Sequence, residues 1–268
     1  NSTFTTTKME VKKMNEEREG ILQNVRETLQ NVPYILSARI YGSWLYNELS
    51  VDMDVAVIVE SNFGIVDAEH YRTLRVIRRS LTEKTGQDID LVPHTADEFV
   101  DRNSPLWYPR YNPSLVFGRD IKGVFRVMPI STAVHSFSFA DLTAYVLHDN
   151  RTICRRQLIR SFNGEEGRIF VSKLLHGPGN ALTYQACRLR TDYVVPPSNL
   201  DGCFEAFDRF YGVDSTTAID FLSACKKSID FERGVLLMNW YESLFDLVIH
   251  GDQFKTDYQS LCHTLRSR

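Results

Sequence analysis

Strand-like and helix-like patterns divide this chain into two parts, and this division limits the fold more than any other feature. β-Branched runs at residues 35–41, 52–60 and 88–92 alternate with helical patterns at 8–30 and 67–84. Beyond about residue 125 the strand patterns end. Helical patterns then follow at residues 138–160, 165–175, 180–190, 200–210, 216–227, 231–249 and 253–265. The sequence therefore predicts an α+β chain with a small mixed sheet flanked by helices, followed by an all-α helical bundle.

The length suits two domains of ordinary size. The chain has 268 residues, which is long for one compact domain and ample for two of roughly 130 residues each. We place the boundary where the strand patterns end, between residues 1–125 and residues 126–268. Within the second part, the Gly177-Pro178-Gly179 run predicts a break between two helices.

Composition excludes several other classes of protein. Charged residues make up 24% of the chain and hydrophobic residues 43%, with a net charge of −3, so a disordered chain and a basic nucleic-acid coat protein are both excluded. No stretch reaches the roughly 18 to 20 apolar residues of a membrane helix. The five cysteines are odd in number and widely spaced, which is typical of reduced thiols. We therefore expect a cytoplasmic protein without a membrane partner.

Two aspartates begin the second predicted strand. The first strand breaks at Gly42-Ser43, and Asp52-Met53-Asp54 follows after a short spacer. Because side chains alternate along a strand, Asp52 and Asp54 lie about 7 Å apart on one face while Met53 faces the core. Carboxylates this close repel each other, and a divalent cation such as Mg²⁺ between them removes the repulsion.

The third predicted strand repeats this arrangement with Asp88 and Asp90. Either could supply a third carboxylate, and three carboxylates on neighbouring strands are typical of metal-dependent phosphoryl chemistry. The turn at Gly42-Ser43 leaves backbone N–H groups and a hydroxyl free to hold a triphosphate.

These motifs resemble the signature of the polymerase-β-like nucleotidyltransferases. The matching residues are YGS at 41–43, DMDV at 52–55 and DIDLV at 88–92, and the resemblance spans about residues 9–120. The spacer before Asp52 is slightly shorter than is usual in that family.

The resemblance implies a Mg²⁺-dependent enzyme that transfers a nucleoside monophosphate, AMP from ATP, to an acceptor hydroxyl and releases pyrophosphate. Asp52 and Asp54 would hold the metal ions that bridge the phosphates, and Gly42 and Ser43 would hold the β- and γ-phosphates. Asp90, followed by two aliphatic residues as in the family, would bind metal and help to deprotonate the acceptor.

The helical part is similar, in general pattern, to the helical domain of the antibiotic (aminoglycoside) nucleotidyltransferases. That resemblance implies a cleft between the two domains, with Lys173 reaching the triphosphate; the alternative is a solvated helix lysine. Trp107, Tyr108 and Tyr111 either stack on a base or sugar or pack as a connector.

Two arginine pairs in the helical part have helical spacing, Arg151 with Arg155 and Arg156 with Arg160. They either line a groove for phosphates or RNA, or form a solvated helix face.

The acidic excess of the first part favours a cationic small-molecule acceptor such as an aminoglycoside, with Glu48, Asp97 and Glu98 flanking the motif strands. A tRNA end and a protein hydroxyl are the other acceptors considered. A nucleotide-binding regulatory module without turnover is the alternative outside enzyme chemistry.

Overall fold

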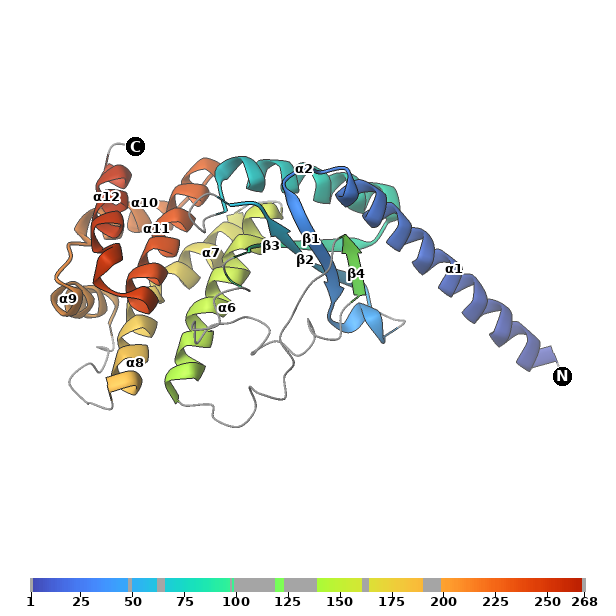
Figure 1. Cartoon of the computed structure of the whole chain (residues 1–268), viewed down its shortest axis with the longest axis horizontal. Coiled ribbons are helices and arrows are strands. Elements are labelled where there is room, and N and C mark those ends of the chain that lie inside the picture. Colours follow the sequence, from blue (N-terminus) through green and yellow to red (C-terminus); the bar gives the residue numbers. More distant parts are fainter. Residues whose placement is uncertain are drawn as a thin grey trace.

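The candidate site is built on a four-stranded sheet with the order β3-β2-β1-β4 (Figure 1). The strands are β1 (Ile35–Tyr41), β2 (Asp52–Val59), β3 (Asp88–Thr95) and β4 (Arg119–Lys122). β1 is antiparallel to both β2 and β4, whereas β2 and β3 are parallel. The computed structural model describes residues 2–47, 50–61, 66–96, 98, 119–122, 139–160, 164–189 and 199–266. The predicted mixed sheet is confirmed.

The sequence of β2 explains why its two aspartates lie at the rim of the core. Met53, Val55 and Val57 have no exposed surface, and Asp52 and Asp54 on the opposite face are partly exposed. This matches the predicted alternation of the strand. β4 was not predicted, because its four residues RDIK contain one apolar side chain, Ile121, which is too little to form a strand pattern.

Among the described residues, the first part of the chain contains the α-helices α1 (Ser2–Gln30) and α2 (Ala68–Thr85). α1 buries Leu22, Val25 and Leu29 at helical spacing. The side chain of Asp67 accepts a hydrogen bond from the backbone N–H of His70 at the start of α2, and Gly86 ends the helix with a φ of 70°. α2 connects β2 to β3 and contacts β3, so it is the crossover that a parallel strand pair needs.

Every described element after β4 is helical, as the sequence predicts. The helices are α6 (Phe139–Ile159), α7 (Gly164–Leu175), α8 (Gly177–Leu189), α9 (Leu200–Tyr211), α10 (Thr216–Cys225), α11 (Phe231–His250), the short 3-10 helix η4 (Asp252–Phe254) and α12 (Lys255–Arg266). Their shared core contains the fully buried aromatic residues Phe204, Phe207, Trp240, Tyr241 and Tyr258. The chain is therefore α+β, with its helices concentrated after the sheet.

The predicted break between two helices is present but lies at His176, because α7 ends at Leu175 and α8 begins at Gly177. The Gly177-Pro178-Gly179 run therefore forms the first turn of α8 and does not interrupt the helices. Proline fits a first helical turn, where its missing N–H would have no intrahelical acceptor. A Cβ atom on Gly177 would lie 2.7 Å from a ring carbon of Tyr241, so glycine also permits the close approach of α8 to α11.

α6 connects the sheet to the helical part. It contacts β3 and α2 on one side and α7, α8 and α11 on the other (Figure 1). The predicted boundary near residue 125 lies outside the described residues, so the division into two domains stays a prediction.

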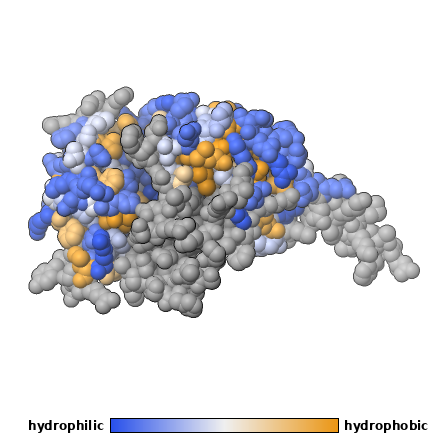
Figure 2. All heavy atoms as spheres, viewed as in Figure 1, coloured by the Kyte–Doolittle hydropathy of each residue, from blue (hydrophilic) through white to orange (hydrophobic). Residues whose placement is uncertain are grey.

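In the view of Figure 2, hydrophilic residues cover much of the described surface around α2, and hydrophobic residues gather over the sheet beneath it. Among the described residues, no helix combines the length and the apolar character needed to cross a membrane.

Candidate active site

The parallel register of β2 and β3 aligns the four predicted carboxylates. Asp52 lies opposite Asp88, and Asp54 lies opposite Asp90. Residues two apart on a strand share a face, so each strand presents its two aspartates in step with those of its neighbour. The first three residues of β2 and of β3 therefore contribute to one acidic patch, at the end of the sheet where these two strands begin. Within this patch, Asp54 and Asp90 lie further inward than Asp52 and Asp88.

The pKa of Asp54 shows how far the positive charges near the patch compensate its negative charges. Burial is the main cause that raises this pKa to about 6, and the charges of Asp90 and Asp52 raise it further. Arg156 and Arg160 act in the opposite direction. Nη1 of Arg156 lies 3.9 Å from Oδ1 of Asp54, which is too far for a hydrogen bond. Asp54 is thus a partly buried carboxylate whose negative charge is incompletely neutralised.

Asp90 has a different environment, because a guanidinium group binds both of its oxygens. Arg160 places Nε 2.5 Å from Oδ1 and Nη2 2.6 Å from Oδ2. Nη1 of Arg156 lies 3.7 Å from Oδ2, and Nε of Arg78 lies 3.8 Å from Oδ1. With 1% of its side chain exposed, Asp90 is compensated by cations from both α2 and α6.

Asp88 lies at the outer edge of the patch, with 44% of its side chain exposed. It accepts hydrogen bonds from Nη2 of Arg78 at 2.6 Å and from Nη2 of Arg160 at 3.3 Å. Between the two candidates for a third carboxylate, the register places Asp90 opposite Asp54, and it places Asp88 opposite Asp52.

A pair of serine hydroxyls connects the Gly42-Ser43 turn to Asp52. Ser43 begins the 3-10 helix η1 (Ser43–Leu45), and its Oγ lies 2.8 Å from Oγ of Ser50. Ser50 Oγ lies 3.2 Å from Oδ1 of Asp52. Sequence reasoning missed Ser50, because a lone serine beside a strand carries no periodic or motif signal. This contact orients both the predicted phosphate-binding hydroxyl and one predicted metal ligand.

Gly42 packs its backbone directly against Asp54. Its φ of 80° and ψ of −166° fall in a region that essentially only glycine occupies. A Cβ atom at this position would lie 2.6 Å from Oδ2 of Asp54. The turn therefore needs glycine both for its backbone conformation and for the space that the carboxylate fills.

We expect Gly42→Ala to lower the free energy of unfolding by about 1–3 kcal/mol and to displace the Asp54 side chain. The matched control is Gly86→Ala, which also has a positive φ of 70° but has open space around the new Cβ atom. The control should lose about 1 kcal/mol through backbone strain alone. Urea unfolding of both variants checks the result, and equal losses would contradict a special role for the Gly42–Asp54 contact.

Asp52 and Asp54 fit a Mg²⁺ ion, whereas the full set of three carboxylates is not assembled. Mg²⁺ is commonly bound by one or two carboxylates together with waters and substrate phosphates, and the incompletely neutralised Asp54 meets that need. Across the described ranges, no three His, Cys, Asp or Glu side chains are grouped as they would be around a metal ion. Arg160 holds the oxygens of Asp90 instead, and the three-carboxylate site stays a prediction.

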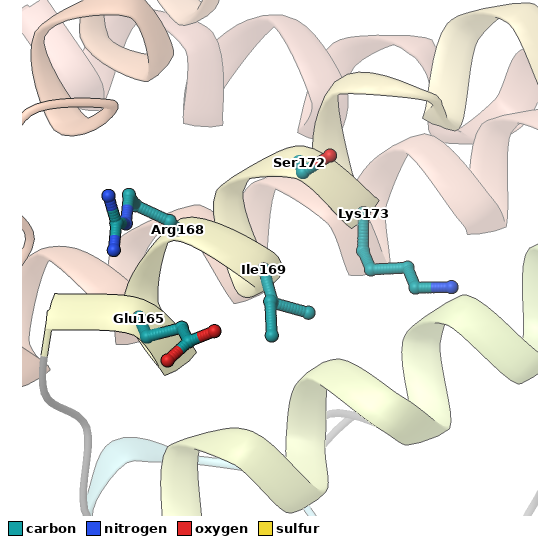
Figure 3. Close-up of a pocket in the computed structure, with 5 residues that line it drawn as sticks. All are labelled: Glu165, Arg168, Ile169, Ser172 and Lys173. Carbon is teal, nitrogen blue, oxygen red and sulfur yellow. The ribbon is translucent and has the colours of Figure 1, made fainter.

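Lys173 lies on α7 and lines an open pocket with Glu165, Arg168, Ile169 and Ser172 (Figure 3). Its side chain extends on the side of α7 where α6 lies, and its charge acts on Asp149 of α6. Burial raises the pKa of Asp149, while Lys173 and Arg156 act to lower it. Lys173 and Arg156 therefore both act on Asp149, whereas among the described residues Lys173 forms no ion pair with an aspartate of β2 or β3.

Neither prediction for Arg151 and Arg155 is correct. Both side chains are buried, so they form neither a groove nor a solvated face. Arg155 pairs with Glu98 and, at 2.6 Å, with Glu242, and Arg151 pairs with Glu242 at 3.3 Å. A buried ion network of these two arginines and two glutamates thus joins the end of β3 to α6 and α11.

Glu98 belongs to this network and does not face a substrate, which corrects the predicted role for it. Burial acts to raise its pKa, but Arg155 and Arg151 outweigh that effect and hold the pKa well below its ordinary value. The other acidic residues assigned to the acceptor, Glu48 and Asp97, lie outside the described residues. The three aromatic candidates Trp107, Tyr108 and Tyr111 also lie outside them.

Arg156 and Arg160 have a different position from the first pair. Side-chain exposures of 37% and 30% place them at the surface of the acidic patch, and both approach its aspartates. A solvated helix face is therefore wrong for them as well. Arg155 and Arg156 are consecutive on α6 but have different partners, because Arg155 belongs to the buried network and Arg156 lies at the patch.

Comparison with known proteins gives one solved structure. No family model and no curated protein matches the chain. The crystal structure of spectinomycin adenyltransferase AAD(9) from Enterococcus faecialis with ATP and spectinomycin matches over 87% of this chain and 98% of that one, at 13% sequence identity and a TM-score of 0.29.

Proposed function

We propose that this chain is a Mg²⁺-dependent nucleotidyltransferase that transfers a nucleoside monophosphate, AMP from ATP, to an acceptor hydroxyl and releases pyrophosphate. The observation that carries the proposal is the aligned acidic patch, in which Asp54 is partly buried and incompletely neutralised beside Asp90 and Asp52. A fold that only needed a stable sheet edge would gain nothing from carboxylates there, because aspartate is unfavourable in strands and buried charge is costly.

Asp52 and Asp54 would hold Mg²⁺, which when bound neutralises the charge that develops on the phosphates. Ser50 would keep the Asp52 carboxylate oriented through its contact with Oδ1. Asp90 would be the third metal carboxylate, and it would help to deprotonate the acceptor hydroxyl. The depth of Asp90 beside Asp54 supports this role over one for the half-exposed Asp88.

The triphosphate would lie between the sheet and the helical part. On the sheet side, Gly42 and Ser43 offer backbone N–H groups and a hydroxyl at the start of η1. On the helical side, Arg156 and Arg160 approach the patch from α6, and Lys173 lies beyond Asp149. Arginine binds phosphate with two parallel hydrogen bonds, so this pair suits a polyphosphate.

A small-molecule acceptor is favoured over RNA. An RNA acceptor needs an extended basic surface, and two of the four arginines that the sequence offered for one are buried in ion pairs. The remaining pair faces the carboxylates. We therefore place a small hydroxylated molecule such as an aminoglycoside first, and a tRNA end or a protein hydroxyl second.

The test is incubation of the protein with α-labelled nucleoside triphosphates and Mg²⁺, in separate arms that contain an antibiotic panel including spectinomycin, total tRNA, or cell lysate. We expect label in the small-molecule fraction and release of pyrophosphate. Label in RNA or protein would move the proposal to those acceptors. Nucleotide binding without pyrophosphate in any arm would favour a regulatory module instead.

A further inference from the structure

Arg160 binds the carboxylate of Asp90 from the position that a metal cation would take. Its planar guanidinium binds both carboxylate oxygens at 2.5 and 2.6 Å and also reaches Oδ2 of Asp88 at 3.3 Å. Two parallel charge-assisted hydrogen bonds form the strongest common pairing of a carboxylate with a side chain. Arg160 follows the last residue of α6, so its backbone lies just outside the regular helix.

This pairing competes with metal coordination. The guanidinium occupies a lone pair on each oxygen of Asp90 and places a positive charge beside both, which weakens binding of Mg²⁺ to this carboxylate. In the described part of the chain no three-carboxylate group is assembled. Arginine stays protonated at all physiological pH values, so deprotonation cannot release Asp90. A polyphosphate can release it, because it offers the guanidinium other anionic oxygens of similar geometry.

We propose that Arg160 is a positioning residue that occupies Asp90 until nucleotide arrives, and that it then exchanges the carboxylate for a phosphate. Metal binding at Asp90 thereby becomes dependent on nucleotide. With 30% of its side chain exposed, Arg160 is accessible to an incoming phosphate, whereas Asp90 is covered. This inference rests on the proposed function, because it takes Asp54 and Asp90 as metal carboxylates and a nucleoside triphosphate as the ligand.

The neighbouring arginines explain why Arg160 is assigned this role. Arg78 binds Asp88 at 2.6 Å but lies 3.8 Å from Asp90, and Arg156 lies 3.7 Å from Asp90. Removal of Arg160 therefore removes both short hydrogen bonds from Asp90. Two weaker cationic neighbours remain, so the buried carboxylate is not left without any compensation.

The experiment compares the unmodified protein with Arg160→Gln and with the control Arg79→Gln. Arg79 lies on α2, pairs with Glu83 and has 81% of its side chain exposed. Two affinities are measured by titration. Electron paramagnetic resonance monitors the binding of Mn²⁺ alone, and a second titration measures the binding of α,β-methylene-ATP without metal. For Arg160→Gln we expect Mn²⁺ to bind about tenfold tighter or more, and the nucleotide about tenfold weaker or more. The control should leave both affinities unchanged.

Opposite shifts of the two affinities are the signature of exchange. A purely structural ion pair would lower both affinities together when it is lost, and that result would overturn the inference. If Arg160→Gln leaves both affinities unchanged while the unmodified protein binds the analogue with Mg²⁺, the inference fails and the proposed function stands. If the unmodified protein binds neither the analogue with Mg²⁺ nor Mn²⁺, the proposed function fails as well.

Arg160→Lys extends the test to a variant that keeps the charge. Lysine offers a point charge in place of the planar pair of donors, so it should hold Asp90 less firmly and give Mn²⁺ affinity between those of the other two proteins. Far-ultraviolet circular dichroism confirms that each variant is folded before titration. If Arg160→Gln does not fold, Arg160→Lys decides the question by the same two opposite shifts.

Discussion

Asp54→Asn is expected to abolish nucleotidyl transfer while raising the stability of the fold at pH 7. The pKa of Asp54 is raised to about 6, first by burial and then by Asp90 and Asp52. Its ionised form therefore destabilises the folded state, by about 3 kcal/mol at most for a shift of about two units. Asparagine removes that charge but keeps the shape, so we expect a net gain of about 1–2 kcal/mol in the free energy of unfolding.

The expected gain depends on pH in a defined direction. Because the folded pKa lies above the ordinary value, the folded state binds the extra proton between about pH 4 and pH 6. The stability that comes from protonated Asp54 is complete below about pH 4 and is lost as the pH rises through 6. The difference between Asp54→Asn and the unmodified protein should thus be largest at pH 7 and disappear towards pH 4.

Urea unfolding at several pH values and pyrophosphate release, measured on the same samples, check both parts. The matched control is Glu83→Gln, an exposed carboxylate paired with Arg79, which should change stability by less than about 0.5 kcal/mol and leave transfer intact. An Asp54→Asn variant that is less stable and still transfers nucleotide would mean that this carboxylate is structural, and the proposed metal site would be withdrawn.

Arg155→Met should give the largest loss of stability of the substitutions considered. Arg155 is fully buried, pairs with Glu98 and Glu242, and donates a hydrogen bond to the carbonyl of Pro93 at 3.2 Å. Removing one member of a buried ion network leaves uncompensated charge, which costs about 3–5 kcal/mol. Urea unfolding measures the loss, and Arg79→Met, at an exposed pair, should stay within about 1 kcal/mol.

A second set of variants separates the charge effect from lost packing. Adding Glu98→Gln to Arg155→Met removes one carboxylate together with one guanidinium, and it leaves the pair of Arg151 with Glu242 intact. We expect this double variant to be more stable than Arg155→Met alone, because the remaining buried charges are then paired. A double variant that is still less stable would show that side-chain volume and hydrogen bonding, rather than charge, determine the cost at this position.

The fold was largely predictable because its elements carry strong local patterns. β2 has consecutive buried aliphatic residues, and α11 buries residues on nearly every side, so both could be recognised without their neighbours. The first turn of α8 was missed because glycine and proline were interpreted as a break, although the first turn of a helix tolerates proline. Packing against Tyr241, which is distant in the sequence, is what favours glycine at the start of that helix.

The sequence predicted which residues belong to the candidate site, but it did not predict which of their side chains pair with one another. Strand alternation alone places Asp52 with Asp54, whereas the alignment of Asp54 with Asp90 depends on the register that the α2 crossover sets. Helical spacing alone showed that Arg151 and Arg155 are neighbours on α6. It gave no sign that Glu98 and Glu242 approach them from elsewhere in the chain, because partners distant in sequence leave no periodic signal.

The different partners of Arg155 and Arg156, which are consecutive on α6, constrain how substrates can enter. A hinge motion that swung the helical part away from the sheet would separate Arg155 from Glu98. These buried charges would then be exposed to solvent or left unpaired. The same motion would carry Arg156 away from Asp54. The two parts of the protein are therefore expected to stay fixed relative to each other through the reaction cycle, so that access depends on side chains and loops at the rim.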